Sequence, residues 1–308
     1  MGDIRFELVE DREKAKILWD ILSPHKTIDD EWDFRYQFFK PLSYKLHFIA
    51  GYDQEKLIGL LPLQLNTLQG LMPPYYPSDN IPFLECFGGD DTDDNRILMK
   101  PGYEQQEQRF LDQITQRAYL APLQIQYSYK NKEADLYENK YLLSLEGLIS
   151  YEDYIDKKWS GSSRKKLRQQ IRKLYRENAI EVMKNDLSDI DYMAELNKRR
   201  FGQNSSFQHE YRADIFKNLA QIYQAEIMSI MVNGKRMGVS YGIKYKDAYL
   251  GMNAGVEESL SDLGKLLVLL QIERAIELGC TVYDGGKGSG GWKSEFKFVA
   301  SPQYILSV

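Results

Sequence analysis

The sequence is poor in the residues that metal and disulfide chemistry require. Its 308 residues include two cysteines, Cys86 and Cys280, and three histidines, His25, His47 and His209. The histidines show no ligand spacing with each other or with cysteine, so we expect no metal site. No Ser-His-Asp combination stands out either. Two cysteines in apolar surroundings are typical of buried free thiols, which fits a reducing compartment.

Long apolar runs and an excess of positive charge are also missing. No stretch approaches the roughly 18 apolar residues that cross a bilayer, so we expect no transmembrane segment. Asp3, Arg5, Glu7 and Glu10 interrupt the N-terminus, where a signal peptide would be apolar. The net charge of -5 and the pI of ≈ 5.5 argue against general attraction to nucleic acid or anionic membranes. These absences predict a cytoplasmic protein.

What is present is a soluble globular chain with two similar halves. The length fits about two domains on a prior of roughly 150 residues each. The first half predicts strands at 45–52, 56–66 and 81–87, a helix at 103–120 and a strand at 123–129. The second half predicts strands at 225–232, 237–245 and 248–254, a helix at 263–278 and a strand at 281–284. We therefore predict an α/β (α+β) fold of two tandem domains, residues 1–145 and 146–308, each a mixed, mostly antiparallel sheet flanked by helices.

The start of the helix at 263–278 is a candidate phosphate site. The first turn of a helix has unpaired N–H groups and a partial positive charge, which suit a pyrophosphate. Ser259 and Asp262 are plausible N-caps, and Gly264 leaves room for a ligand to approach. The other interpretation is an ordinary capped helix.

A glycine-rich loop, Gly285–Gly291, follows the strand that ends at Asp284. It is not a P-loop, because Lys287 is followed by glycine instead of Ser or Thr. It is either a mobile active-site loop or a plain connector, and we expect a strand at 292–296 behind it. Lys293 would position an acidic acceptor or stabilise an oxyanion, and Asp284 would accept from an amine. Alternatively, the two side chains form an ion pair with each other.

Two charged segments complete the pattern. The helix predicted at 162–178 has seven basic residues between Arg164 and Arg176 and no acid. It is a solvated face, a patch for cofactor or tRNA phosphates, or a membrane-surface helix. The acidic segment Asp90–Asn95 is predicted to be a solvated loop. Arg96 and Gly102 occupy the places where an EF-hand needs glycine and glutamate.

Several pieces of the second half together resemble a known family. They are Trp159-Ser160 with the basic helix, Arg199-Arg200-Phe201, Val239-Ser240-Tyr241-Gly242, Asn253-Ala254-Gly255, Leu263-Gly264-Lys265-Leu266-Leu267, Tyr283-Asp284 and Trp292-Lys293-Ser294-Glu295-Phe296. The combination resembles the acetyltransferase-like domain of cellulose-biosynthesis-associated acyltransferases. These belong to the GNAT superfamily and are relatives of the Fem-type aminoacyl transferases. The resemblance implies two tandem GNAT-like domains, the second including the basic helix.

The resemblance implies an enzyme that transfers an acyl group from acyl-CoA, such as acetyl-CoA, to a small-molecule or peptide amine, without a metal. The donor would lie on Leu263, Gly264, Lys265 and Leu266. Of the usual Arg/Gln-x-x-Gly-x-Gly/Ala pattern only Gly264 aligns. The residues implied in catalysis are Lys293, Asp284 and Tyr241, and those implied in substrate binding are Trp292, Arg200 and Asn253.

Two alternatives remain open at this point. A Fem-type enzyme would use aminoacyl-tRNA, bound through the basic helix, and act on a cell-wall precursor or peptide. Trp292-Lys293 resembles the aromatic–lysine pair of that family. A catalytically silent binding module with the tandem fold is the other alternative. The transferase interpretations expect the start of the helix at 263 and Lys293 to border one cleft.

Overall fold

The computed structural model describes residues 3–42, 44–66, 83–116, 124–127, 135–288 and 291–307. The chain forms two compact units, Met1–Glu138 with Pro302–Val308, and Asn139–Ser301. The sequence analysis places the division after residue 145, whereas these units divide after Glu138 and the last residues belong to the first unit. Two long strands, β9 (Asp135–Ser144) and β15 (Val299–Ser307), each contribute residues to both units.

The first unit contains short strands and three α-helices within its described residues. The elements are β1 (Ile4–Val9), α1 (Arg12–Leu22), η1 (Ile28–Asp30), α2 (Trp32–Phe39), β2 (Lys45–Leu46), β3 (Phe48–Asp53), β4 (Lys56–Leu61), β5 (Leu63–Asn66), β6 (Phe83–Cys86), η2 (Gly89–Asp91), β7 (Leu98–Met99), η3 (Glu104–Gln106), α3 (Glu107–Gln116) and β8 (Gln124–Tyr127). The strands β1-β3-β4-β7 form an antiparallel sheet. Strands β2, β5 and β6 are antiparallel neighbours, and β8 pairs with β6 and with the end of β15.

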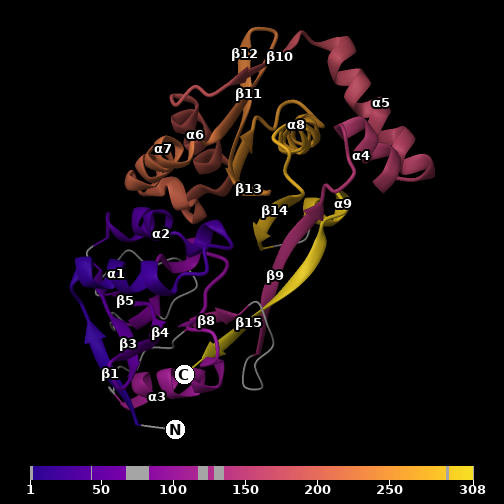
Figure 1. Cartoon of the computed structure of the whole chain (residues 1–308). Coiled ribbons are helices and arrows are strands. Elements are labelled where there is room, and N and C mark those ends of the chain that lie inside the picture. Colours follow the sequence, from indigo (N-terminus) through magenta and orange to yellow (C-terminus); the bar gives the residue numbers. More distant parts are fainter. Residues whose placement is uncertain are drawn as a thin grey trace. The chain divides into compact units, whose positions relative to one another are not determined.

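Helices α1 and α3 cover opposite faces of the β1-β3-β4-β7 sheet (Figure 1). Trp19 of α1 packs in a cluster with Phe48, whereas Phe110 of α3 packs with Ile49. Close approach of α3 requires small residues: a Cβ on Gly51 or Gly59 would lie 2.4 or 2.6 Å from the Phe110 ring. Aromatic and aliphatic side chains from both helices therefore sandwich the sheet.

The second unit carries a larger sheet. Its elements are α4 (Tyr151–Lys158), α5 (Gly161–Glu177), β10 (Ile180–Lys184), α6 (Asp189–Phe201), η4 (Gly202–Asn204), η5 (Ser206–Gln208), α7 (Tyr211–Tyr223), β11 (Glu226–Val232), β12 (Lys235–Tyr245), β13 (Ala248–Val256), α8 (Leu263–Glu277), β14 (Val282–Lys287) and α9 (Gly291–Glu295). The strand order is β10-β11-β12-β13-β14-β9. All neighbours are antiparallel except β13 and β14, which are parallel. The predicted mixed, mostly antiparallel sheet is confirmed.

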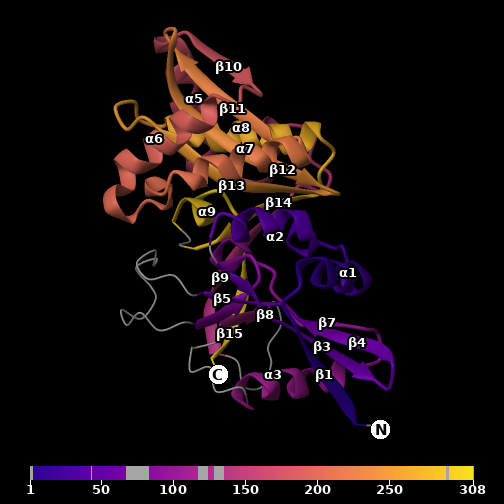
Figure 2. The same cartoon turned by 90° about the vertical axis from the view of Figure 1, so that its left-hand side faces the viewer.

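Helices cover both faces of this sheet (Figure 1, Figure 2). On one face lie α6 and α7, where Tyr241 of β12 donates a hydrogen bond to the Phe216 carbonyl at 2.9 Å. On the other face lies α8, which shares a buried cluster with Tyr249 of β13 and Tyr283 of β14. Successive strand residues point to opposite faces, so the sheet presents alternate residues to the two helical layers.

Most of the predicted elements are present, but one predicted strand is wrong and some observed elements were not predicted. The Asn233-Gly234 hairpin is confirmed, with positive φ angles of 50° and 76°. The strand predicted at 292–296 is wrong, because these residues lie in the short helix α9 and its end. The helices α6 and α7, which precede β11, were not among the predicted elements. Residues 81–82, 117–120, 123 and 128–129 of predicted elements lie outside the described residues.

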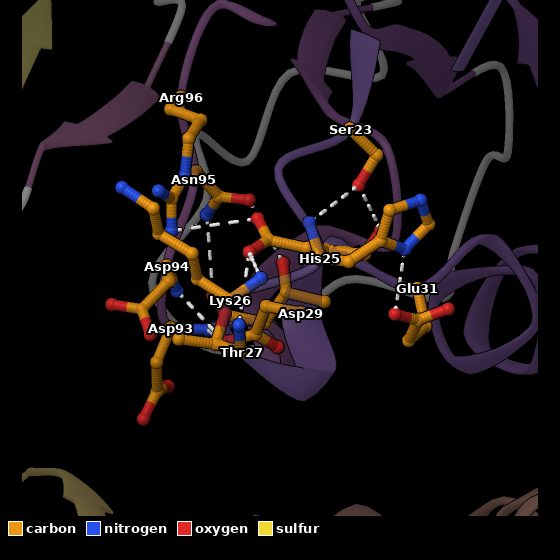
Figure 3. Close-up of polar contacts among 12 residues, drawn as sticks. Ser23, His25, Lys26, Thr27, Asp29, Glu31, Asp93, Asp94, Asn95 and Arg96 are labelled. Atoms are coloured by element: carbon orange, nitrogen blue, oxygen red, sulfur yellow. Dashed lines mark hydrogen bonds and ion pairs between the residues drawn. The ribbon is translucent and has the colours of Figure 1, made fainter. Parts of the chain in front are cut away.

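The acidic segment at 90–95 is an anchored turn, so the prediction of a solvated loop is wrong for its described core. Thr92, Asp94 and Asn95 are buried. The Asp29 carboxylate accepts hydrogen bonds from the backbone N–H groups of residues 93 and 94 at 3.1 and 2.9 Å (Figure 3). Arg35 of α2 is fully buried and donates to Asn95 Oδ1 at 2.6 Å and to the residue 94 carbonyl at 3.0 Å. Long-range bonds that the local sequence does not reveal hold this turn.

Candidate active site

The parallel pair β13 and β14 parts within the sheet. The register joins Ala248 to Val282, Tyr249 to Tyr283 and Leu250 to Asp284, and it ends there. Both strands are described over their full length, and β13 continues to Val256 while β14 continues to Lys287. Ligands of open α/β sheets bind beyond the carboxyl ends of such strands. The parting of β13 and β14 is therefore the place to look for a substrate.

A β-bulge lies beside the parting. Tyr241 pairs with Asn253 and Gly242 with Gly251, so Met252 of β13 is an extra residue without a partner on β12. Bulges twist a strand, redirect its backbone groups, and are frequent next to active sites. The β13 amides just after Leu250 are thus directed differently from those of a regular ladder.

The first turn of α8 follows β13 directly, and it contains the four residues predicted to bind the donor. Leu263 and Leu266 are buried in the core, so only their backbone groups could meet a ligand. A Cβ on Gly264 would find only Val256, at 3.8 Å, and the surroundings of this glycine are open. The Asp262 side chain makes no capping bond to the helix. The N–H groups of the first turn are therefore available for an anion.

Lys265 connects this turn to two other helices. Its Nζ lies 3.4 Å from Asp262 Oδ1, 3.3 Å from Glu295 Oε1 of α9 and 3.4 Å from Gln170 Oε1 of α5. Gln170 also donates to Asp262 at 2.8 Å. The contact with Glu295 sets α9 beside the start of α8.

Lys293 is a buried lysine of α9, with 6% of its surface exposed. Its ammonium donates to the carbonyls of Gly286 and Lys287 at 3.1 and 2.8 Å, and lies 5.2 Å from the centre of the Tyr141 ring. Two positions along a helix turn a side chain by about 200°, so Lys293 faces β14 while Glu295 faces α8. Whether a cleft joins Lys293 to the start of α8 stays a prediction.

Asp284 is held by a lysine that the sequence analysis did not propose. Its Oδ2 forms an ion pair of 2.7 Å with Nζ of Lys140 from β9, and its Oδ1 accepts from the Gly286 N–H at 2.9 Å. The sequence left open an ion pair between Asp284 and Lys293. The structure shows Asp284 paired with Lys140. The carboxylate sits at the last register position of β14 with β13. Lys140 lies about 140 residues earlier, so no local sequence pattern could have indicated it.

The remaining predicted residues have contrasting surroundings. Trp292 is 43% exposed and packs edge-on against Phe298 at 5.6 Å, next to Lys293. Asn253 accepts a 3.4 Å hydrogen bond from Asn197 of α6. Arg200 is exposed on α6, with its guanidinium over its neighbour's ring.

Tyr241 is a core residue. It is fully buried, its hydroxyl is bonded to the Phe216 carbonyl, and burial raises its pKa far above the usual range. A hydroxyl in this state neither receives nor releases a proton near neutral pH. The geometry gives no support to the proton-handling role predicted for Tyr241.

The basic helix α5 is neutralised on one flank only. Arg164 and Arg168 pair with Asp156 of α4, and Arg168 also pairs with Glu152. Leu167, Ile171 and Leu174 are buried, as the helical spacing predicts. Three cations, namely Lys165, Lys166 and Arg172, are exposed and form no ion pair with any described residue.

Neither a metal site nor a membrane-spanning helix is present in the described part of the chain. Within the described residues, no three acidic, histidine or cysteine side chains gather as metal ligands would. None of the helices in the described ranges is both long and apolar enough to cross a membrane. A hollow of ≈ 380 Å³ in the first unit is lined by none of the predicted site residues; its lining is Glu10, Arg12, Phe39, Tyr44, Lys45 and Leu46.

Residues 161–294 match the family model described as acetyltransferase (GNAT) domain. This part of the chain, somewhat less than half of it, is therefore similar to a GNAT acetyltransferase domain. The match supports an acyltransferase, and the predicted GNAT fold is confirmed. The finer assignment to the cellulose-associated branch stays a prediction. Among curated proteins, none matches the chain by sequence.

Solved structures extend the likeness to the whole chain. FemX has 10% identity and a TM-score of 0.63, over 99% of this chain and 97% of FemX. A tandem GNAT protein from the clavulanic acid biosynthesis pathway has 10% identity and a TM-score of 0.55, over 98% and 97% of the two chains. L-PGS from Bacillus licheniformis has 12% identity and a TM-score of 0.55, over 96% and 91%. At these identities the likeness is one of fold, and the fold is the predicted tandem GNAT arrangement.

Proposed function

We propose that this GNAT domain transfers an acyl group from acyl-CoA to an amine. The observation that carries the proposal is the parting of β13 and β14 after Leu250 and Asp284, with α8 as the next element after β13. The opening would take the acyl thioester, and the unpaired amides of α8 would take the pyrophosphate. The match of residues 161–294 to an acetyltransferase family supports this choice of chemistry.

In the proposed reaction the amine nitrogen attacks the thioester carbonyl carbon. The carbon–sulfur bond then breaks, and the proton that the nitrogen loses goes to the departing sulfur, so that coenzyme A leaves as the thiol. Holding donor and amine together supplies much of the acceleration. Backbone N–H groups of β13 beyond Leu250 would stabilise the developing oxyanion. Lys293 would add positive charge, and Asp284 would receive the amine.

The start of α8 fits a pyrophosphate through its backbone, while its nearby side chains partly oppose one. Glu257 and Asp262 lie in the connection that leads into α8. Glu257 is paired with Arg199 at 3.0 Å, and Asp262 is paired with Lys265. Hydrogen bonds from Tyr192 and Arg199 lower the pKa of Glu257, so it is ionised at neutral pH. We expect these acids to moderate the affinity for a polyphosphate donor.

Thermal unfolding with and without ligand tests the donor. At a concentration about 100 times its dissociation constant, a ligand that binds only the folded state stabilises it by roughly 2.7 kcal/mol. We expect acetyl-CoA and free coenzyme A to raise the unfolding temperature, and primary amines to accelerate thiol release from acetyl-CoA. If neither acyl-CoA, coenzyme A nor charged tRNA shifts the transition, the binding-module alternative is favoured.

A second candidate donor is aminoacyl-tRNA, with a cell-wall precursor or peptide as acceptor. Lys165, Lys166 and Arg172 of α5 favour it, because exposed cations without acidic partners attract phosphates. The likeness to FemX over 99% of this chain is consistent with it. Of the two donors, acyl-CoA ranks first because residues 161–294 match an acetyltransferase model.

A further inference from the structure

Lys140 is the least expected charged residue near the parting strands. It lies on β9, opposite Lys287 of β14, and its side chain is 7% exposed. Its Nζ contacts Asp284 Oδ2 at 2.7 Å, and the Asp284 side chain is 14% exposed. Burying a lysine is costly unless the ammonium is paired. The enclosed pair of Lys140 and Asp284 therefore differs from an ordinary surface ion pair and needs its own explanation.

The position of Asp284 supplies that explanation. Tyr283, its neighbour, is buried on the α8 face, so Asp284 points to the opposite face of the sheet. It is the last residue of β14 in register with β13, beside Leu250. Its Oδ1 is fixed by the Gly286 N–H and its Oδ2 by Lys140. A carboxylate has about four acceptor sites, and these two contacts leave capacity for another donor.

We propose that Lys140 is a positioning residue that holds the Asp284 carboxylate at the parting of β13 and β14, where this carboxylate binds the protonated amine of the acceptor. The inference rests on the proposed function, since it assumes that the acceptor is an amine. Primary amines are largely protonated at neutral pH, because their pKa values are about 10. An ionised carboxylate of fixed orientation attracts such a group and directs it to the opening, where the ammonium gives up one proton to water before its nitrogen attacks.

The need for Lys140 follows from burial. Removing one partner of an enclosed ion pair leaves the other charge uncompensated. Without Lys140, Asp284 would turn toward water, and this change would remove the oriented acceptor site. Arginine at position 140 would keep the positive charge, whereas methionine would keep only the apolar stem.

The test compares Lys140→Met, Lys140→Arg, Asp284→Asn and the double variant Lys140→Met/Asp284→Asn with the wild type. Lys217→Met is the matched control, because Lys217 forms an ion pair of the same 2.7 Å length, with Asp191 on the surface of the same unit. One readout is hydrogen–deuterium exchange of the Gly286 amide. The other is the KM for primary amines, with acetyl-CoA saturating and release of the thiol followed over a range of pH.

We expect Lys140→Met to speed exchange at Gly286 and to raise the KM for the amine, each by at least about tenfold, with a smaller effect on kcat. Lys140→Arg should restore most of both, and Lys217→Met should change neither. Asp284→Asn should raise the KM similarly, and the double variant should be no worse than either single one.

The outcomes separate the two proposals. If Lys140→Met folds and leaves both exchange at Gly286 and the KM unchanged, the positioning role is wrong. If the wild type transfers no acetyl group to any amine while Lys140→Met still frees the Gly286 amide, the acyl-CoA function fails and the hold on Asp284 stands. Faster exchange with an unchanged KM would show that Asp284 does not bind the acceptor.

Discussion

At the scale of single residues, Lys293 shows how burial fixes the position of a positive charge. Its ammonium bonds two carbonyls of the glycine-rich loop, so it both ties down that loop and places a positive charge beside β14. A surface lysine would do neither. This dual placement makes Lys293 the residue whose removal we expect to be most informative.

We predict that Lys293→Ala lowers turnover by roughly tenfold or more, because it removes the proposed stabilising charge and loosens residues 286–287. The measurement is kcat for acetyl transfer, with circular dichroism to verify the fold. Lys297→Gln is the control, since Lys297 is exposed and its ammonium lies over the ring of Trp159 at the end of α4. Turnover of Lys293→Ala close to that of the control would remove Lys293 from the catalytic residues.

Asp262 provides a test of where the donor phosphates lie. It has a positive φ of 65° directly before α8, and asparagine tolerates that conformation well. We predict that Asp262→Asn tightens acetyl-CoA binding by a few-fold, since a negative charge leaves the site where the pyrophosphate would sit. Titration calorimetry at low and high salt measures this. An unchanged dissociation constant at low salt would place the pyrophosphate elsewhere.

At the scale of elements, two glycines of the second unit have opposite reasons for being glycine. Gly242 lies in β12 where a Cβ would come within 2.3 Å of the Tyr249 hydroxyl. Gly264 has no such neighbour and no positive φ, so neither packing nor backbone conformation requires it. The remaining reason to lack a side chain at Gly264 is access to the first turn of α8.

We predict that Gly242→Ala destabilises the fold by about 1–3 kcal/mol through overpacking. Gly264→Ala should be neutral or stabilising by up to about 1 kcal/mol, because alanine favours a helix. Urea unfolding measures both. Gly264→Ala should also weaken acetyl-CoA binding, and full affinity in this stable variant would argue against a donor at α8.

The local sequence at α9 does not distinguish a helix from the strand predicted at 292–296. Trp, Phe and Lys in Trp292–Phe296 fit either element over so few residues. The decision comes from packing, because Phe296 is buried against Trp159 at 5.7 Å and its carbonyl accepts from the Tyr154 hydroxyl at 2.6 Å. Contacts with α4, well over a hundred residues earlier, therefore determine the local structure.

At the scale of the whole molecule, charge is distributed unevenly. The chain has a net charge of -5, yet α5 exposes Lys165, Lys166 and Arg172 without acidic partners among the described residues. The acids of α4 compensate only Arg164 and Arg168. A local cationic face on an acidic protein permits selective contact with phosphates without general attraction to nucleic acid.

We predict that, if aminoacyl-tRNA is the donor, tRNA affinity falls steeply with salt, and that Lys165→Gln/Lys166→Gln/Arg172→Gln reduces the slope of log K against log salt by about two to three. Fluorescence anisotropy with labelled tRNA measures the slope between about 50 and 300 mM salt, because phosphate contacts weaken with salt in this range. Lys184→Gln, which removes an exposed lysine from β10, is the control. A flat response in the wild type would exclude this donor.

The sequence by itself determined the architecture of this protein and much of its class. Alternating strands, the Asn233-Gly234 turn and the apolar stripe of α5 depend on neighbours a few residues apart, and such periodic patterns survive in the sequence. The combination of short motifs in residues 159–296 was enough to indicate the resemblance to the GNAT superfamily. The sequence also indicated Lys293 and Asp284 as candidate site residues, because they flank a glycine-rich loop.

Only the tertiary structure decided which of these residues lie close together. It buried Tyr241 in the core, anchored the acidic turn on Asp29 and Arg35, and brought Lys140 to Asp284 across two strands. It also ended the pairing of β13 and β14 at Leu250 and Asp284. These features arise from contacts between segments that are distant in the chain. The energies of such contacts depend on burial and strand register, which the spacing of neighbouring residues does not determine.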